Sequence, residues 1–208
     1  CEKTGAKIQE LSKAIGLDHR IGPHFLNASV GFGGSCFQKD ILNLVYLCKF
    51  YGLDEVAEYW HQVVKINDYQ KDRFAQKIID TFGGDLTGKK ITLLGWAFKA
   101  NTNDSRETPA IAVSEKLFSA GAKIVIYDPM VTARTIWYDI KNYWKNTQEE
   151  SVLKSRIFIL STLDLFNIDT NAFVILTEWE EFKYLSKINN IVFDGRNLLD
   201  SSLYSIGK

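Results

Sequence analysis

The chain has 208 residues, 46% of them hydrophobic, so it can bury a core and is neither disordered nor fibrous. Its 25 basic residues balance 25 acidic ones, which gives no electrostatic basis for binding nucleic acid or an anionic membrane surface. No apolar run is long enough to span a bilayer, and the three cysteines and three histidines lack metal-ligand spacing. We therefore expect a cytoplasmic protein of one or two domains, without a bound metal, in a reducing compartment.

The first part of the chain has helical periodicity interrupted by a loop. Residues 3–15 place apolar side chains at helical spacing, and residues 18–32 form an irregular segment typical of binding loops. A second helix is expected over 36–52. A third runs from Asp54 to the glycine pair after Phe82, and at about 28 residues it would be about 42 Å long. Because a compact domain needs no helix of that length, it should connect domains or subunits.

After residue 85 the pattern changes to short β-branched and aromatic runs. A helix is expected over 109–120, and residues 130–155 form a connection that includes some helix. Apolar strands separated by helices predict an α/β fold with a Rossmann-like, doubly wound parallel sheet. We divide the chain into a helical segment, 1–84, and a sheet domain, 85–208. The expected strands are Lys90–Ala97, Lys123–Tyr127, Arg156–Leu160, Phe173–Thr177 and Ile191–Asp194.

Three motifs follow expected strands: Gly95–Lys99, Asp128–Pro129 and Asp194–Arg196. In open parallel sheets, ligands bind at the carboxyl ends of the strands. The first of these motifs lacks the glycine fingerprint of a dinucleotide-binding turn. These residues are therefore candidate ligand contacts, although each cation alone is more often a surface charge.

The stretch Gly31–Asp40, GFGGSCFQKD, combines glycines, a cysteine and charges. Ser35 and Gln38 have the spacing of a capping box, which predicts that Cys36 is the first residue of a helix. Helix N-terminal N–H groups and the nearby Lys39 would favour a thiolate there. A lone cysteine is more often a small buried side chain, so these residues alone leave an activated nucleophile and a packing residue both open.

Residues Ala28–Cys48 resemble the catalytic-cysteine segment of the UDP-glucose 6-dehydrogenase family in its animal form. The similarity continues, in the family's order, through Gly95–Thr108, Ile126–Pro129, Leu176–Phe182 and Phe193–Asp200. The resemblance implies NAD-dependent oxidation of UDP-glucose to UDP-glucuronate in two hydride transfers, through a cysteine thiohemiacetal and thioester. We also expect a homo-oligomer, formed through the long helix, while the balanced charge argues against nucleic acid or a membrane surface as a partner.

The resemblance assigns residues to roles. It implies that Cys36 is the nucleophile, that Asp40 helps position a lysine and water, and that Arg20 reaches into a neighbouring subunit's site. Because the turn GWAFK after the first strand lacks the glycine fingerprint, we expect UDP-sugar rather than NAD in this sheet. The implied cofactor contacts are Cys36, Phe37, Lys39 and Arg106, and the implied substrate contacts are Arg20, Phe25, Gly31, Phe32, Gly33, Phe37, Phe98, Lys99 and Arg196.

In the family, the amino-terminal half carries the G-x-G-x-x-G turn of an NAD-binding domain and a catalytic lysine, asparagine and glutamate. None of these precedes Cys1 in this sequence. We therefore expect the chain to be the central helix and UDP-binding half, inactive alone. Two alternatives stay open. One is a related UDP-N-acetylmannosamine or GDP-mannose dehydrogenase, and the other is a non-catalytic nucleotide-sugar-binding or oligomerisation module.

Overall fold

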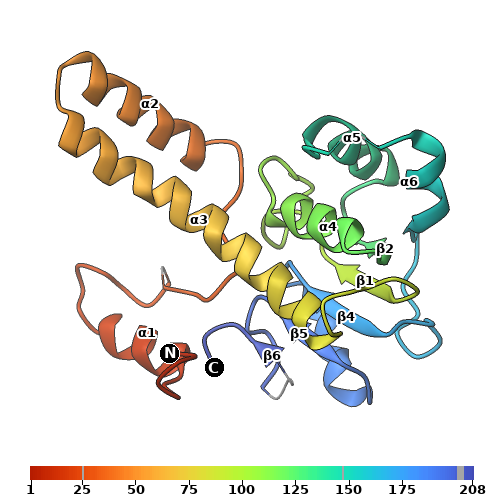
Figure 1. The fold of residues 1–208 in the computed structure, drawn as a ribbon. Coiled ribbons are helices and arrows are strands. Elements are labelled where there is room, and N and C mark those ends of the chain that lie inside the picture. The colour runs from red at the N-terminus through yellow and green to blue at the C-terminus, as the bar shows by residue number, and fades with distance from the viewer. Residues whose placement is uncertain (25, 147, 201–203) are drawn as a thin grey trace.

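The structure, a computed structural model, describes residues 1–24, 26–146, 148–200 and 204–208. Helices α2 and α3 form a hairpin that extends away from a sheet covered by further helices (Figure 1). The elements are α1 (Ile8–Ile15), α2 (Phe37–Phe50), α3 (Asp54–Thr81), β1 (Lys90–Leu94), α4 (Pro109–Ser119), β2 (Lys123–Tyr127), α5 (Ala133–Tyr143), α6 (Glu150–Arg156), β3 (Ile157–Ile159), β4 (Ala172–Ile175), the 3-10 helix η1 (Glu180–Lys187), β5 (Val192–Asp194) and β6 (Tyr204–Ser205).

Helix α3 joins two hydrophobic clusters. Near its start, Ala57 and Val64 pack with buried residues of α2, and near its end Phe74 and Ile78 belong to the main core around the sheet. Fully burying a valine, isoleucine or phenylalanine side chain stabilises a fold by about 1.5–3 kcal/mol. The predicted 28-residue helix is confirmed, and burial at both ends explains why one continuous helix connects the hairpin to the sheet.

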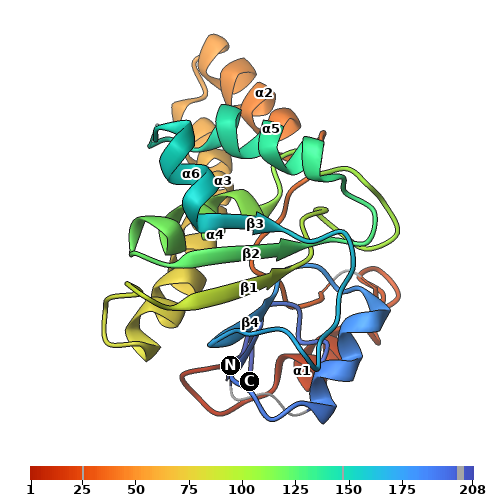
Figure 2. The same ribbon diagram turned by 90° about the vertical axis from the view of Figure 1, so that its right-hand side faces the viewer.

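The described strands form a parallel sheet in the order β3-β2-β1-β4-β5-β6, which confirms the predicted α/β, doubly wound class. Figure 2 shows β3, β2, β1 and β4 side by side. Leu94 at the end of β1 lies opposite Tyr127 of β2 and Ile175 of β4, and Ile175 lies opposite Asp194 of β5. The strand order reverses between β1 and β4. The loops that follow these strands therefore leave the sheet at one edge, where ligands bind in such folds.

Several boundaries differ from those predicted. Helix α1 begins at Ile8 rather than near residue 3, because Gly5 adopts a φ of +73° that ends any earlier helical turn. Strand β1 ends at Leu94 because Gly95, with φ +97°, turns the chain tightly against Thr177. The short strand β6 was not predicted, since two residues carry no periodicity. It pairs with β5, where the ring of Tyr204 stacks on Phe193.

Helix α4 starts as its sequence indicates. Thr108 is the N-cap, its hydroxyl accepts the N–H of Ala110, and Pro109 occupies the first helical position. The helix packs against β2 and against α3. The loop that precedes α4, residues 95–108, is thereby fixed between the sheet edge and α3.

Candidate functional site

Cys36 is exposed and immediately precedes α2. The prediction that it is the first helical residue of a capping box is wrong. The Ser35 hydroxyl contacts the Cys36 sulfur at 3.5 Å, and the Gln38 amide donates to Glu107 Oε2 at 3.1 Å, so neither side chain caps the helix. A long-range partner on the loop before α4 has replaced the local capping bond.

The glycines of the cysteine loop, residues 29–36, let it pack tightly against the 95–108 loop. The Gly34 N–H donates to the Arg106 carbonyl at 2.8 Å. A Cβ at Gly33 would overlap the Glu107 carbonyl oxygen, and one at Gly34 would lie 3.1 Å from the Phe98 ring. Gly34 also has a φ of +92°, which favours glycine. The glycine pattern therefore serves close packing of the loop that carries Cys36.

Two of the predicted cofactor residues line one hollow. A pocket of ≈ 530 Å³ is lined by both Lys39 of α2 and Arg106. Asp104 raises the pKa of Arg106, chiefly through a hydrogen bond, and nearby Cys36 adds a smaller electrostatic contribution. Cys36 and Phe37 are exposed at the start of the same helix. The pocket is completed by Gly34, Ser35, Gln38, Leu42, Glu107 and Tyr143.

Predicted substrate residues lie after β1 and β5. Arg196 is mostly buried, and its guanidinium lies 2.5 Å from Glu178, which also accepts the N–H of Ala100 at 3.3 Å. Burial lowers the pKa of Arg196 from its ordinary value, against the opposing charge of Glu178. Lys99 is exposed, with its ammonium 5.5 Å from the centroid of the Phe98 ring. Because Phe98 also covers Gly34, this cationic edge is continuous with the cysteine loop.

The Asp128 carboxylate accepts hydrogen bonds from the backbone N–H groups just after β1. It accepts the N–H groups of Trp96 and Ala97, at 2.6 and 3.0 Å, and the Trp179 indole at 3.2 Å. In dinucleotide-binding sheets the corresponding turn faces a pyrophosphate. Here those two N–H groups are already paired with an anionic side chain, so this turn does not fit the pyrophosphate of NAD.

The remaining predicted residues are placed as follows. Arg20 is exposed and pairs with Asp18 inside its own loop, and within the described residues no hydrogen bond or ion pair joins it to the cysteine loop. Phe25 lies outside the described residues. The exposed Phe37 packs edge-on against Phe32, with ring centroids 4.6 Å apart. Asp40 is exposed, and its N–H donates to the Cys36 carbonyl at 2.8 Å.

Three residues that contact the site's predicted members were missed: Asn67, Glu107 and Glu178. The sequence held a signal for Asn67, because this amide continues the 3–4-residue spacing of buried positions along α3. Glu178 lies in a block already matched to the family, but its partner Arg196 follows a different strand. Glu107 also lies in a matched block, but its contact to Gln38 spans 69 positions of sequence.

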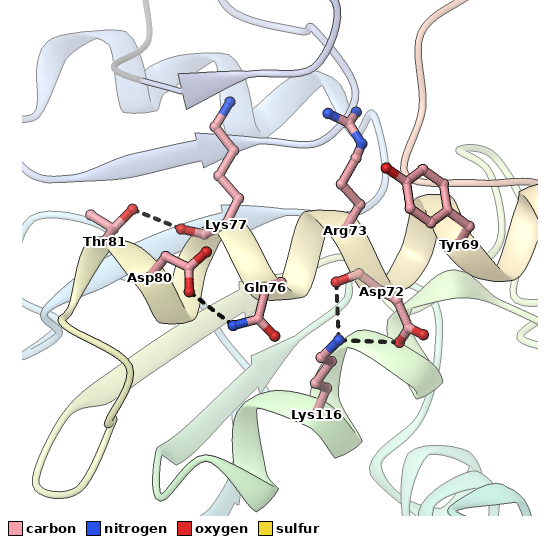
Figure 3. Close-up of a pocket in the computed structure, with 8 residues that line it drawn as sticks. All are labelled: Tyr69, Asp72, Arg73, Gln76, Lys77, Asp80, Thr81 and Lys116. Carbon is pink, nitrogen blue, oxygen red and sulfur yellow. Dashed lines mark hydrogen bonds and ion pairs between the residues drawn. The ribbon is translucent and has the colours of Figure 1, made fainter.

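A separate pocket of ≈ 650 Å³ beside α3 contains none of the predicted site residues (Figure 3). Its charges are largely paired, since Lys116 bonds to Asp72 and Arg73 bonds to Glu2. Among the described residues, no group of three or more His, Cys, Asp or Glu side chains could hold a metal ion. Within the same part of the chain, no helix is long and apolar enough to cross a membrane.

Comparison with known proteins agrees with this architecture. Residues 92–201 match the UDP-glucose/GDP-mannose dehydrogenase family, UDP binding domain, and residues 1–69 match the same family's central domain. Over its whole length the chain is 47% identical to UDP-glucose 6-dehydrogenase 1 of Glycine max, and 48% identical to UDP-glucose 6-dehydrogenase 3 of Oryza sativa subsp. japonica. In each case it covers 48% of the relative.

A solved structure of a UDP-glucose dehydrogenase from Pyrobaculum islandicum is also similar. The TM-score is 0.72 at 27% sequence identity, over 99% of this chain and 44% of the archaeal one. The chain therefore spans about half the length of the curated relatives it matches. The family match covers more than half of its residues and both of its structural parts. The chain belongs to the UDP-glucose/GDP-mannose dehydrogenase family.

Proposed function

We propose that this chain is the central and UDP-binding portion of a UDP-glucose 6-dehydrogenase, with residues 1–84 carrying the cysteine loop and residues 85–208 binding the UDP-sugar. The observation that carries the proposal is the placement of an exposed Cys36 on a loop packed against the cationic carboxyl edge of the sheet. The plant relatives named for this activity support the choice of substrate.

The diphosphate of UDP-glucose would be held by cations at this edge. Lys99 is exposed, and Arg196 is fixed in one place by Glu178. Planar guanidinium groups suit phosphate oxygens, and a pre-fixed side chain loses little entropy on binding. The sugar would lie between Phe98 and the loop at Phe32 and Gly33, within reach of the cysteine. Arg20, whose only described partner is Asp18, would serve the site of a second subunit.

Cys36 acts at the aldehyde stage of the oxidation. Its thiolate adds to the C6 carbonyl carbon and forms a C–S bond, which gives a thiohemiacetal after the oxygen is protonated. Loss of hydride from C6 and of the hydroxyl proton leaves a thioester. Water then attacks the thioester carbon, the C–S bond breaks, and the carboxylate leaves with the thiolate restored. Asp40, one helical turn from Cys36, helps to orient that water.

NAD fits the chain only in part. Lys39 and Arg106 face one open pocket and would hold an anionic part of the dinucleotide, whereas Asp128 occupies the donors that a pyrophosphate would need at β1. When bound, NAD supplies the hydride acceptor for the oxidation. We therefore place the remainder of the NAD site in the half of the relatives that this chain does not cover, and expect no turnover from this chain alone.

The helical hairpin supports assembly into a homo-oligomer. Helices α2 and α3 carry many exposed apolar side chains, and exposed apolar surface of this kind commonly marks a protein–protein interface. A second copy of the chain packed along this hairpin would bury them. The members of this set are Leu42, Tyr46, Leu47, Phe50, Val56, Tyr59, Ile66 and Tyr69.

The nucleophile assignment is tested by Cys36→Ser in the assembled enzyme, with Cys1→Ser as the matched control. We expect the Cys36 variant to lose steady formation of UDP-glucuronate by at least about 10³-fold, because serine is a much weaker nucleophile than a thiolate. The Cys1 variant should keep its rate. Sustained acid formation by Cys36→Ser would remove Cys36 from the nucleophile role.

The substrate is tested by calorimetry of the chain with UDP-glucose, UDP-N-acetylmannosamine, GDP-mannose and NAD, each alone. Tightest binding of UDP-glucose, with little binding of NAD, is the expected result. Preference for another sugar nucleotide would move the chain to another branch of the family, and no binding at all would favour a scaffold. Robust NADH production by the isolated chain would contradict the division of the NAD site.

A further inference from the structure

The side chain of Asn67 forms a two-way hydrogen bond with the backbone of the cysteine loop. Asn67 is 4% exposed on α3, its Oδ1 accepts the Phe32 N–H at 2.8 Å, and its Nδ2 donates to the Phe32 carbonyl at 3.1 Å. The amide group thus satisfies both backbone groups of one residue, as a neighbouring strand would. One helical turn later, Gln70 donates to the Ser29 carbonyl at 3.2 Å. Helix α3 therefore holds the loop at two points.

Gly31 lets the loop reach Asn67. Its φ is +150°, and a Cβ there would lie 2.7 Å from Asn67 Oδ1 and 3.3 Å from Lys71 Cγ. Any side chain at this position would push the loop away from α3 and lengthen both bonds to Phe32. The preceding Val30 is fully buried, and its side chain fills the space that a Cβ at Gly195, after β5, would need. The loop is therefore seated between α3 and the carboxyl edge of the sheet.

The position of Phe32 affects the position of the start of α2. Its ring packs edge-on against Phe37, the residue that follows Cys36. Gly33 and Gly34, between Phe32 and the cysteine, are packed against Glu107 and Phe98 and have little room to move independently. A shift of the backbone at Phe32 would therefore displace the chain that carries the thiol.

An apolar side chain at position 67 would leave the Phe32 N–H and carbonyl without their partner. Asn67 shares a face of α3 with buried Val64, Lys71 and Phe74, so its amide is enclosed by protein. Burying an amide costs free energy unless its groups are bonded, and both Asn67 groups bond to Phe32. Asn67 therefore fixes the position of the loop.

We propose that Asn67 is a positioning residue: it anchors the backbone of Phe32 to α3 and so sets where the Cys36 thiol stands relative to the sheet edge. The proposal rests on the proposed function for its catalytic consequence. The anchor itself does not require Cys36 to be catalytic.

The test uses Asn67→Ala, Asn67→Asp and, as the matched control, Gln76→Ala. Gln76 is an exposed amide of the same helix that bonds to Asp80 within α3. Aspartate keeps an acceptor for the Phe32 N–H but sets a carboxylate oxygen against the Phe32 carbonyl in place of the donor, so it should displace the loop at that carbonyl. It also keeps the test decisive if the alanine variant fails to fold.

Hydrogen exchange of this chain measures directly how well the bond to Asn67 protects the Phe32 amide. We expect the Phe32 amide to exchange about tenfold faster in Asn67→Ala, since one hydrogen bond of ordinary strength is lost, while the β1 amides keep their wild-type rates. In the assembled enzyme, kcat should fall about 10–100-fold with a smaller change in KM, because the nucleophile is displaced and the UDP contacts remain. Gln76→Ala should change neither quantity.

Two results would overturn the proposal: unchanged exchange at Phe32 in folded Asn67→Ala, or, in either Asn67 variant, a kcat that stays at the wild-type value while only the melting temperature falls. Failure of the proposed function looks different, because the wild-type assembled enzyme would then not oxidise UDP-glucose at all. In that case faster exchange at Phe32 in the variants would still establish the anchor.

Discussion

Gln38 and Glu107 are joined by a hydrogen bond of 3.1 Å between Nε2 and Oε2, although 69 positions of sequence separate them. Gln38 lies in the first turn of α2, and Glu107 lies just before α4. Glu107 also has a φ of +52°, a left-handed conformation that costs a non-glycine residue about 1–2 kcal/mol. The start of the cysteine helix is thus bonded to a strained residue of the sheet domain.

Removing this hydrogen bond should weaken the contact between the start of α2 and the loop before α4. A double-mutant cycle with Gln38→Ala and Glu107→Ala, measured by urea unfolding, should give a coupling energy of about 0.5–1.5 kcal/mol, the range for a bond near solvent. Gln62→Ala is a suitable control, because Gln62 bonds to Glu58 inside α3. A coupling energy of zero would show that the Gln38–Glu107 bond does not hold the two parts together.

Gly33→Ala should destabilise the chain by about 1–3 kcal/mol and weaken binding of UDP-glucose, because the new Cβ would overlap the Glu107 carbonyl and displace the loop. Gly52→Ala is the comparison. Gly52 has a φ of +71° with open space around it, so its change should lower stability through backbone strain alone and leave binding unchanged. Thermal unfolding and calorimetry measure the two effects, and equal binding by both variants would contradict the packing argument.

Asp128→Ala should destabilise the chain by more than about 4 kcal/mol. The carboxylate accepts from the backbone of Trp96, Ala97, Met130 and Val131 and from the Trp179 indole, and alanine would leave these donors without it. Asp128→Asn keeps one acceptor oxygen, so it should lower the free energy of unfolding by less. The urea midpoints of the two variants check this order, and a mild effect of alanine would mean that water replaces the carboxylate.

Stability should fall in acid through Glu2. A hydrogen bond from Arg73 is the main cause that lowers the pKa of Glu2 to about 2, from an ordinary value of 4.5, and the Gly207 N–H adds to it. A lowered folded-state pKa stabilises the fold above the unfolded value, so this contribution is present above pH 4.5 and is lost between pH 4.5 and 2. Because the Arg73 side chain is 35% exposed, screening limits it to about 1–2 kcal/mol.

The variant Glu2→Gln isolates this effect, because glutamine does not titrate. Its urea midpoint should be lower than that of wild type at pH 7, and the two should converge as the pH approaches 2. A wild-type midpoint that declines in parallel with the variant over pH 4.5–2 would show that other carboxylates carry the acid sensitivity.

Much of the fold could be predicted because its elements are marked locally. The KIVIY run of β2 and the Thr-Pro start of α4 lie where expected, since hydrophobic period and capping act over a few residues. The capping box at Ser35 failed because Gln38 found a partner in Glu107, and a tertiary bond replaced the local one. Strand β6 was missed because its two residues are held by pairing with β5.

By itself, the sequence determined the α/β class, the length of α3 and the residues of the cysteine loop, because periodicity and residue type carry that information. Only the tertiary structure decided what holds the loop. Asn67, Glu107 and Phe98 contact it from 35 to more than 60 positions away, and no local pattern encodes such partners. Their contacts depend on chain segments meeting after α3 and the sheet have packed, which explains why the loop's residues were predictable while its anchors were not.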